Sequence, residues 1–332
     1  MRFQKLDLNL LVALDAMLTT QSITRAAERL NLSQSAMSNA LGRLREHLGD
    51  ELLVQVGRKM ELTPRALLLQ DAVRDVLVRV DTTISAKPEF IPATSERVFR
   101  IFVSDYTMVT LMPHLMALAY RTAPNVRFEL LPQVNEPQRL LDRGEVDLLV
   151  IPLIYCSPNH PAQVLLDEDF CCILDAQSPL AGRPLTLETY KAAGHVVMQP
   201  PGASPPFEGS AMLKLGIVRR VEVSTFSFVG ALSLLAGTNR ICTVHRRLAR
   251  YGQGLLPLKL LELPVELPKM EQSMQWHAYR TNDPGLVWLR DVLQQAVAVM
   301  DNNWFEKYVK LNIAHCCCIN CTISYINNTK KI

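Results

Sequence analysis

The chain has 332 residues, of which 48% are hydrophobic and 20% charged. This composition excludes a disordered protein, and the length favours about two domains. The formal net charge of +3 is too small to indicate a nucleic-acid partner by itself, so DNA binding must be argued from a local motif. Asp7, Asn9 and Asp15 interrupt the apolar start of the chain, which argues against a signal peptide or a membrane span. We therefore expect a cytoplasmic protein with no membrane partner.

Three short helices are predicted at the start of the chain. Leucines at helical spacing predict the first helix over about residues 6–19. Ser22 is a good N-cap for a second helix over 23–30, and Ser33 for a third over 34–48. A short turn joins the second and third helices, and alanines are available for their crossing. This arrangement predicts a helix-turn-helix.

The third predicted helix has an apolar inner face and a polar outer face. We expect the inner face to contain Ala36, Met37, Ala40, Leu41 and Leu44. Gln and Asn can pair with adenine, Arg with guanine, and Ser with base edges or phosphates, so the outer face suits a recognition helix in the major groove. The candidate DNA-binding residues of the helix-turn-helix are Arg25, Ser33, Gln34, Ser35, Ser38, Asn39 and Arg43. The alternative is an ordinary helical bundle with a solvated polar face.

A β-hairpin wing is predicted next, with strands over 53–56 and 60–62. Its turn contains Arg58 and Lys59, which complete the candidate DNA-binding set. A basic tip of this kind can lie against a phosphate or enter a minor groove. The alternative is an ordinary basic turn.

The residues of this region resemble the LysR-type transcriptional regulators. The stretches that carry the resemblance, in order, are 8–11, 22–29, 32–38, 41–44, 48–49 and 62–65. The start of the chain and its later part look most like the NodD branch, which includes regulators of nodulation and of aromatic-compound catabolism. The resemblance implies a homodimer or homotetramer that binds double-stranded promoter DNA, and it favours an activator with an aromatic inducer.

A long linker helix is predicted to begin with Thr63 as cap and Pro64 at its first position, and to run to about residue 85. It contains a candidate coiled-coil seam with spacings of 4, 3 and 4, which consists of Leu69, Val73, Val76 and Val80. Such a seam can contribute to a dimer. The alternative is a helix that packs on its own domain. A proline-containing hinge is expected up to residue 96.

From residue 97 the pattern alternates between strands and helices. Strands are predicted over 98–103, 126–131 and 146–151, with helices over 106–123 and 137–143. This order predicts a parallel sheet covered by helices. A second α/β block follows, and we expect the last strand and helix to return to the first block. The resemblance implies a two-lobed regulatory domain of the type 2 periplasmic-binding-protein kind.

The predicted fold class is α/β, with an N-terminal winged helix-turn-helix, a long linker helix and a C-terminal two-lobed domain. The expected boundaries are 1–63 for the DNA-binding domain, 64–96 for the linker and dimerisation helix with its hinge, 97–301 for the regulatory domain and 302–332 for an atypical tail. Within the regulatory domain we expect lobe I over 97–163 and 269–301, and lobe II over 164–268.

The family layout places a small-molecule effector in the cleft between the lobes, beyond the carboxyl ends of the strands. The candidate effector-binding residues are Ser104, Asp105, Tyr106, Pro152, His195, Gln199, Phe226, Phe228 and Thr243. The two Phe side chains could stack on an aromatic ring, while Ser104 and His195 could bind a hydroxyl or a carboxylate. For each residue the alternative is structural: a Phe in the core, a Ser cap, or a His bonded to the backbone.

Other classes of protein are less consistent with the sequence. It contains no Gly-rich phosphate loop, no HExxH motif and no nucleophile elbow, so we predict neither an enzyme nor a cofactor. The main rival interpretation is a small-molecule sensor that acts through a protein partner.

The eight cysteines form two groups. Those scattered through apolar surroundings predict reduced, buried thiols, and they are Cys156, Cys171, Cys172 and Cys242. The others crowd with a histidine into 315–321 without paired CxxC spacing. We therefore predict no metal and interpret 302–332 as an unstructured extension, with a zinc site as the alternative.

Overall fold

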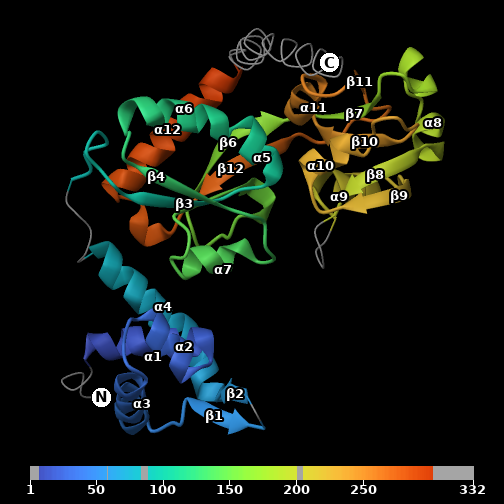
Figure 1. The fold of residues 1–332 in the computed structure, drawn as a ribbon. Helices are drawn as coiled ribbons and strands as arrows, with labels where there is room; N and C mark the ends of the chain where they lie inside the picture. The colour runs from blue at the N-terminus through green and yellow to red at the C-terminus, as the bar shows by residue number, and fades with distance from the viewer. Residues whose placement is uncertain (1–6, 58, 84–88, 200–204, 302–332) are drawn as a thin grey trace, which may run out of the picture.

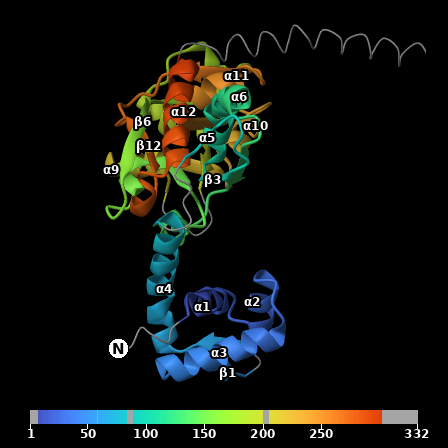
Figure 2. The ribbon, with the colours of Figure 1, turned by 90° about the vertical axis from the view of Figure 1, so that its left-hand side faces the viewer.

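The computed structural model describes residues 7–57, 59–83, 89–199 and 205–301. Figures 1 and 2 show a small helical domain joined by one long helix to a larger domain of two α/β lobes. Arg58 and the predicted tail lie outside the described residues. The arrangement agrees with the predicted fold class.

The N-terminal domain contains the helix-turn-helix and the wing. Its elements are α1 (Leu8–Thr20), α2 (Ile23–Arg29), α3 (Gln34–Leu48), β1 (Leu53–Val56) and β2 (Lys59–Leu62). The two strands pair antiparallel, as a hairpin wing requires.

The helices of this domain begin where the sequence predicts side-chain caps. Ser22 Oγ accepts from the Arg25 N–H, and Ser33 Oγ accepts from the Ala36 N–H. Met37, Leu41 and Leu44 form the buried stripe of α3. The prediction that Ala36 also faces inward is wrong, because a stripe centred on those three positions leaves residue 36 on the exposed flank.

The linker helix α4 (Pro64–Thr83) packs along α1. Leu69 and Val73 are part of the N-terminal core, so the prediction of a free four-residue seam is wrong for these two positions. Both side chains pack within their own domain, because α4 lies against α1. The exposed apolar positions of α4 include Leu68, Ala72 and Val76, which are spaced by four residues.

Lobe I has a five-stranded sheet in the order β4-β3-β5-β12-β6. Its strands are β3 (Val98–Phe102), β4 (Arg127–Leu131), β5 (Leu148–Pro152), β6 (Ala162–Glu168) and β12 (Met270–Gln275). The first three are mutually parallel, but β12 runs antiparallel to both of its neighbours. The prediction of a parallel sheet is thus confirmed for β3, β4 and β5, and β12 joins them as an antiparallel strand. The reason is that the chain leaves lobe I along β6 and returns from lobe II along β12.

Helices cover both faces of this sheet, with α6 and α12 on one side and α7 on the other (Figure 1). The single helix expected over 106–123 is divided into α5 and α6, because Pro113 near the start of α6 has no N–H to continue the ladder. The helical elements of the lobe are α5 (Asp105–Thr110), α6 (Met112–Thr122), α7 (Pro137–Asp142), η2 (Leu153–Tyr155), η4 (Ala278–Arg280) and α12 (Pro284–Asp301).

Lobe II has a second five-stranded mixed sheet in the order β11-β7-β10-β8-β9. Its strands are β7 (Phe170–Asp175), β8 (Gly194–Met198), β9 (Arg220–Thr225), β10 (Ile241–His245) and β11 (Leu258–Leu261). Its helical elements are η3 (Pro179–Gly182), α8 (Leu187–Ala192), α9 (Phe207–Lys214), α10 (Phe228–Ser233) and α11 (Arg246–Gln253).

The cysteines of the regulatory domain are free thiols, as predicted. Cys171, Cys172 and Cys242 are buried in the sheet of lobe II, and Cys156 is half-buried. Burial raises the pKa of the Cys171 thiol to about 12, which keeps it protonated and unreactive.

Lobe I contacts the linker helix through α7 and η4. Arg74 on α4 joins three parts of the chain, because it pairs with Asp15 of α1 at 2.5 Å and with Glu145, just after α7, at 3.0 Å. The neighbouring Gly144 has φ +62° and lies against Val78, where a Cβ would approach to 3.0 Å. Among the described helices, none is long and apolar enough to cross a membrane.

Candidate DNA-binding and effector-binding sites

The outer face of α3 is open to solvent. It presents the exposed side chains Gln34, Ser35, Ser38, Asn39 and Arg43. Ser33 caps the helix, with its Oγ 3.1 Å from the Ala36 nitrogen and 2.9 Å from the Ser35 Oγ. The N-terminus of α3 therefore combines short polar side chains with the partial positive charge of the helix dipole, which suits a phosphate.

The remaining predicted DNA-binding residues flank this face. Arg25 is exposed on α2 and donates from Nη2 to the Thr20 carbonyl oxygen at 2.7 Å. This bond holds the guanidinium at the C-terminal end of α1. Lys59 is exposed at the start of β2.

Two residues that the sequence analysis did not single out hold the wing against α3. Arg45 donates from Nε to the Glu51 carbonyl oxygen at 2.8 Å and from Nη2 to the Leu53 carbonyl oxygen at 2.9 Å. Asp50 Oδ1 accepts from Thr63 Oγ1 at 2.6 Å. Arg45 is therefore a positioning residue.

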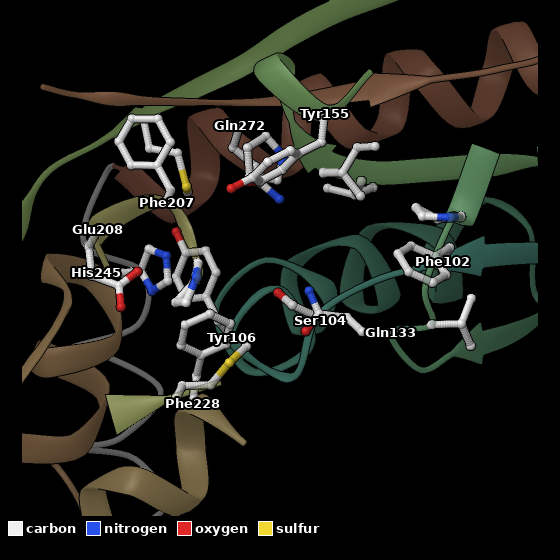
Figure 3. A pocket seen from close by; sticks show the side chains of 18 of the residues that line it. Phe102, Ser104, Tyr106, Gln133, Tyr155, Phe207, Glu208, Phe228, His245 and Gln272 are labelled. Carbon is white, nitrogen blue, oxygen red and sulfur yellow. The ribbon is translucent and has the colours of Figure 1, made fainter. Parts of the chain in front are cut away.

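A cavity of about 680 Å³ lies between the two lobes (Figure 3). Its size is that of a small-molecule site. Much of its wall is aromatic, with side chains from both lobes: Phe102, Tyr106, Tyr155, Phe207, Phe228 and His245. Among the described residues, no group of three or more His, Cys, Asp or Glu side chains is placed to hold a metal ion.

Four of the residues proposed from the sequence line this cavity, namely Ser104, Tyr106, Pro152 and Phe228. The lining does not include Asp105, His195, Gln199, Phe226 or Thr243. Asp105 lies at the start of α5 and bonds to lobe II beside the cavity. Phe226 is 77% exposed.

His195 and Thr243 lie inside lobe II, around the buried ring of Tyr190. His195 Nε2 is 2.7 Å from the Tyr190 carbonyl oxygen, and Thr243 Oγ1 is 2.6 Å from the Tyr190 hydroxyl oxygen. Successive side chains of a strand point to opposite faces of the sheet. Met198, three positions after His195 on β8, therefore faces the other way and lines the cavity. For His195 the structural alternative given by the sequence analysis, a histidine bonded to the backbone, is the one that the structure shows.

The cavity also contains residues that the sequence analysis missed, above all Glu208, His245 and Gln272. His245 is the last residue of β10 (Ile241–His245), so its place at a strand end was a usable signal. Gln272 belongs to β12 (Met270–Gln275), whereas the sequence predicts this strand only over 274–277. Glu208 is in the first turn of α9. The apolar pattern of this helix is like that of the other helices, so it gave no sign that Glu208 lines a cavity.

Burial alters the ionisation of two of these side chains. It lowers the pKa of His245 to about 3, so the imidazole is neutral. It raises the pKa of Glu208 to about 7, although the nearby Arg219 acts in the opposite direction. The His245 ring stacks on Tyr106, with 3.9 Å between ring centroids and 10° between planes. The Tyr106 hydroxyl in turn donates to Glu168, which pairs with Arg247 at 3.0 Å.

Comparison with known proteins gives the family. The profile of the "Bacterial regulatory helix-turn-helix protein, lysR family" matches residues 8–67, and that of the "LysR substrate binding domain" matches residues 93–298. The chain is 41% identical to "Nodulation protein D 2" of Rhizobium leguminosarum bv. phaseoli over 91% of its length and 96% of the relative. It is also 41% identical to "Nodulation protein D 1" of Rhizobium meliloti (strain 1021), over 91% of the chain and 98% of the relative.

Solved structures of full-length regulators have the same fold. A full-length OxyR variant from Pseudomonas aeruginosa aligns with a TM-score of 0.69 at 18% identity, over 88% of this chain and 94% of that one. CbnR in complex with its target DNA aligns with a TM-score of 0.58 at 16% identity, over 88% of this chain and 100% of that one. The resemblance to LysR-type regulators of the NodD branch is thus confirmed. The chain belongs to the LysR family, and it is a DNA-binding transcriptional regulator, not an enzyme, with an effector-binding domain.

Proposed function

We propose that this protein activates transcription in response to a small aromatic effector bound between the two lobes. The observation that carries this proposal is the cavity, whose wall combines aromatic rings from both lobes with a few buried polar groups. Rings such as Phe207 and Phe228 offer faces and edges on which an aromatic effector can pack. The relatives named Nodulation protein D support a NodD-like activator. A regulator of this kind acts in the cytoplasm, where the chromosome lies.

The proposed operator contacts are made by α3, the start of α2 and the wing. α3 would lie in the major groove with its N-terminal side chains on the bases, and the wing would follow the backbone or minor groove. The proposed residues are Arg25, Ser33, Gln34, Ser35, Ser38, Asn39, Arg43, Arg58 and Lys59. The open polar face of α3 supports this assignment, since an interface with a protein partner would be more apolar.

We further propose that the protein works as a homodimer or homotetramer. The exposed stripe of Leu68, Ala72 and Val76 on α4 supports this, because Leu68 is 82% and Val76 41% exposed. Spacings of four residues place these side chains along one face of the helix. A second copy of α4 could cover that face. In this proposal the stripe of Leu68, Ala72 and Val76 takes the place of the seam expected from the sequence.

The experiment that tests the proposed function is a binding titration of the purified protein. DNA from upstream of its own gene and of neighbouring genes is compared with random DNA of equal length at two salt concentrations. We expect sequence-specific binding that weakens at the higher salt, because phosphate contacts release counterions, and that changes when small aromatic compounds are added. Equal affinity for every DNA, with or without aromatic compounds, would instead favour a sensor that acts through a protein partner.

A further inference from the structure

The polar groups in the cavity wall are unequally satisfied. Ser104 Oγ accepts from the Thr107 N–H at 3.1 Å, and the Tyr106 hydroxyl donates to Glu168, so both are occupied. His245 Nδ1 and Gln272 Oε1, by contrast, are buried and have no hydrogen-bond partner among the described residues. Buried polar atoms are normally paired, and leaving one unpaired is costly. Two such atoms in the wall of one cavity point to a ligand that pairs with them.

Both side chains are held so that they can accept a hydrogen bond. His245 is 3% exposed and neutral, so one of its ring nitrogens is an acceptor, and its stacking on Tyr106 fixes the ring plane. Gln272 is also 3% exposed, and its Nε2 donates to Thr107 Oγ1 at 3.3 Å. That bond uses the amide nitrogen, so the Gln272 carbonyl oxygen is left to accept a hydrogen bond from a ligand. Each group can therefore accept a hydrogen bond from a donor on the ligand, Gln272 through Oε1 and His245 through Nδ1 when the ring proton is on Nε2 (Figure 3).

The charges around the cavity disfavour an anionic ligand. The lining formed by the described residues contains two carboxyl groups, Glu136 and Glu208, and no Lys or Arg. Glu136 is exposed and paired with Arg139 at 3.1 Å, whereas Glu208 is 3% exposed. A carboxylate ligand would lose its hydration near Glu208 without gaining a cationic partner.

We propose that the cavity selects an uncharged ligand whose polar end donates a hydrogen bond, with His245 and Gln272 as acceptors and Glu208 as the group that rejects carboxylates. This inference rests on the proposed effector function of the cavity. It assigns specificity to three residues on three different elements, β10, β12 and α9.

Three probes with one ring system test the proposal: 2-naphthol, which donates a hydrogen bond, 2-methoxynaphthalene, which only accepts, and 2-naphthoate, which is anionic. Their affinities for the full chain are measured by calorimetric titration at pH 8. We expect 2-naphthol to bind about fivefold more tightly than the methyl ether, the value of an ordinary neutral hydrogen bond. It should bind at least about tenfold more tightly than 2-naphthoate, since the anion must be desolvated without a partner.

Variants assign these differences to residues. His245→Leu and Gln272→Met each remove an acceptor at similar side-chain volume. In each variant the preference for 2-naphthol over the methyl ether should fall from about fivefold toward equal affinity. Glu208→Gln should strengthen 2-naphthoate binding about tenfold and leave the methyl ether unchanged, because only the anion meets the removed charge. Gln163→Met, an exposed change on β6, is the matched control and should leave all three affinities as they are.

Val134→Trp separates the specificity proposal from the proposal that the cavity binds the effector. Val134 lines the cavity and is exposed, so a larger side chain there should block the site without disturbing the core. If Val134→Trp abolishes binding but 2-naphthoate is the tightest probe, or the preference survives in His245→Leu and Gln272→Met, the specificity proposal is wrong and the effector cavity stands. If no probe binds, or Val134→Trp changes nothing, the effector cavity itself is wrong and the specificity proposal is wrong with it.

Discussion

Ser227 on lobe II donates a hydrogen bond from Oγ to Asp105 Oδ2 on lobe I at a distance of 2.6 Å. The same carboxylate oxygen accepts from the Val229 N–H at 3.0 Å. Asp105 is followed by Tyr106, whose ring forms part of the cavity wall. The contact between the lobes and the wall of the effector cavity are thus built by consecutive residues at the start of α5. A ligand that moves Tyr106 would therefore also act on the contact between the lobes.

The first prediction concerns this contact. Asp105→Ala leaves two donors of α10 without their acceptor, so we expect the free energy of unfolding to fall by about 1–3 kcal/mol. The Val229 amide should also exchange its hydrogen faster, because its bond to Asp105 is lost. Urea unfolding and hydrogen exchange measure the two effects. The exposed Asp291→Ala on α12 is the control and should stay within about 0.5 kcal/mol of the parent. Unchanged exchange at Val229 would show that the lobes are held elsewhere.

Arg74 couples the DNA-binding domain to lobe I, and its loss gives the second prediction. Its side chain is 12% exposed and that of Asp15 is 10% exposed, so Arg74→Gln leaves a buried carboxylate unpaired. Burial already raises the pKa of Asp15 even with Arg74 beside it. We expect a loss of about 3 kcal/mol in the free energy of unfolding. Denaturant unfolding followed by circular dichroism measures it.

Glu145→Gln tests the same contact from the regulatory side. Glu145 is partly exposed, so we expect a small stability loss of about 1 kcal/mol or less but a weaker effect of effector on operator affinity. Glu129→Gln, which removes an exposed pair with Arg100, is the matched control. An effector response equal to that of the control would mean that the Arg74–Glu145 pair does not transmit the signal.

The third prediction separates two neighbouring arginines of α3. Arg43→Ala should weaken operator binding by about 1–3 kcal/mol and leave stability unchanged, because Arg43 is exposed and is proposed to read a base. Arg45→Ala should instead lower stability by about 1–2 kcal/mol, because it removes two hydrogen bonds to the wing. Anisotropy titrations and thermal unfolding distinguish the two. Undiminished operator affinity in Arg43→Ala would remove Arg43 from the proposed site.

The fourth prediction concerns the pH dependence of stability. The folded-state pKa of Glu208 is about 7, above its ordinary value of 4.5, so the folded chain keeps this proton while the unfolded chain loses it. The resulting stability is fully present below about pH 4.5 and is lost as pH rises through 7. Glu208→Gln should therefore exceed the parent by about 3 kcal/mol at pH 8 and match it near pH 4.5. Thermal unfolding at several pH values measures the difference, with the exposed Glu266→Gln as control. A constant difference across this range would contradict the assignment.

Much of the N-terminal domain could be predicted because its signals are local. The Ser22 and Ser33 caps each bond to a backbone N–H three residues ahead, so the sequence shows both partners together. The start of α3 at Gln34 follows the predicted bound for this reason, and its end at Leu48 also agrees with the prediction. The inner face of α3 was predicted less well, because the position of Ala36 depends on how α3 is rotated against α1 and α2.

The regulatory domain shows where local signals fail. The direction of β12 depends on the chain crossing twice between the lobes, which no pattern within the strand reports. The run of buried residues along β8 fits a strand covered on both faces, but the sequence does not say which face meets the cavity, so His195 was chosen and Met198 was not.

By itself the sequence determined the helix-turn-helix with its caps and exposed polar face and, through the resemblance that these stretches carry, the class of protein. It also determined the alternation of strands and helices over 98–151. These depend on periodicity and on contacts within a few residues. Only the tertiary structure decided which residues enclose the cavity, because Ser104 and Gln272 are far apart in the chain and meet only when β12 returns to lobe I. It also decided that Arg45 holds the wing and that Arg74 joins the domains, since a charged side chain shows its partner only once the chain has folded around it.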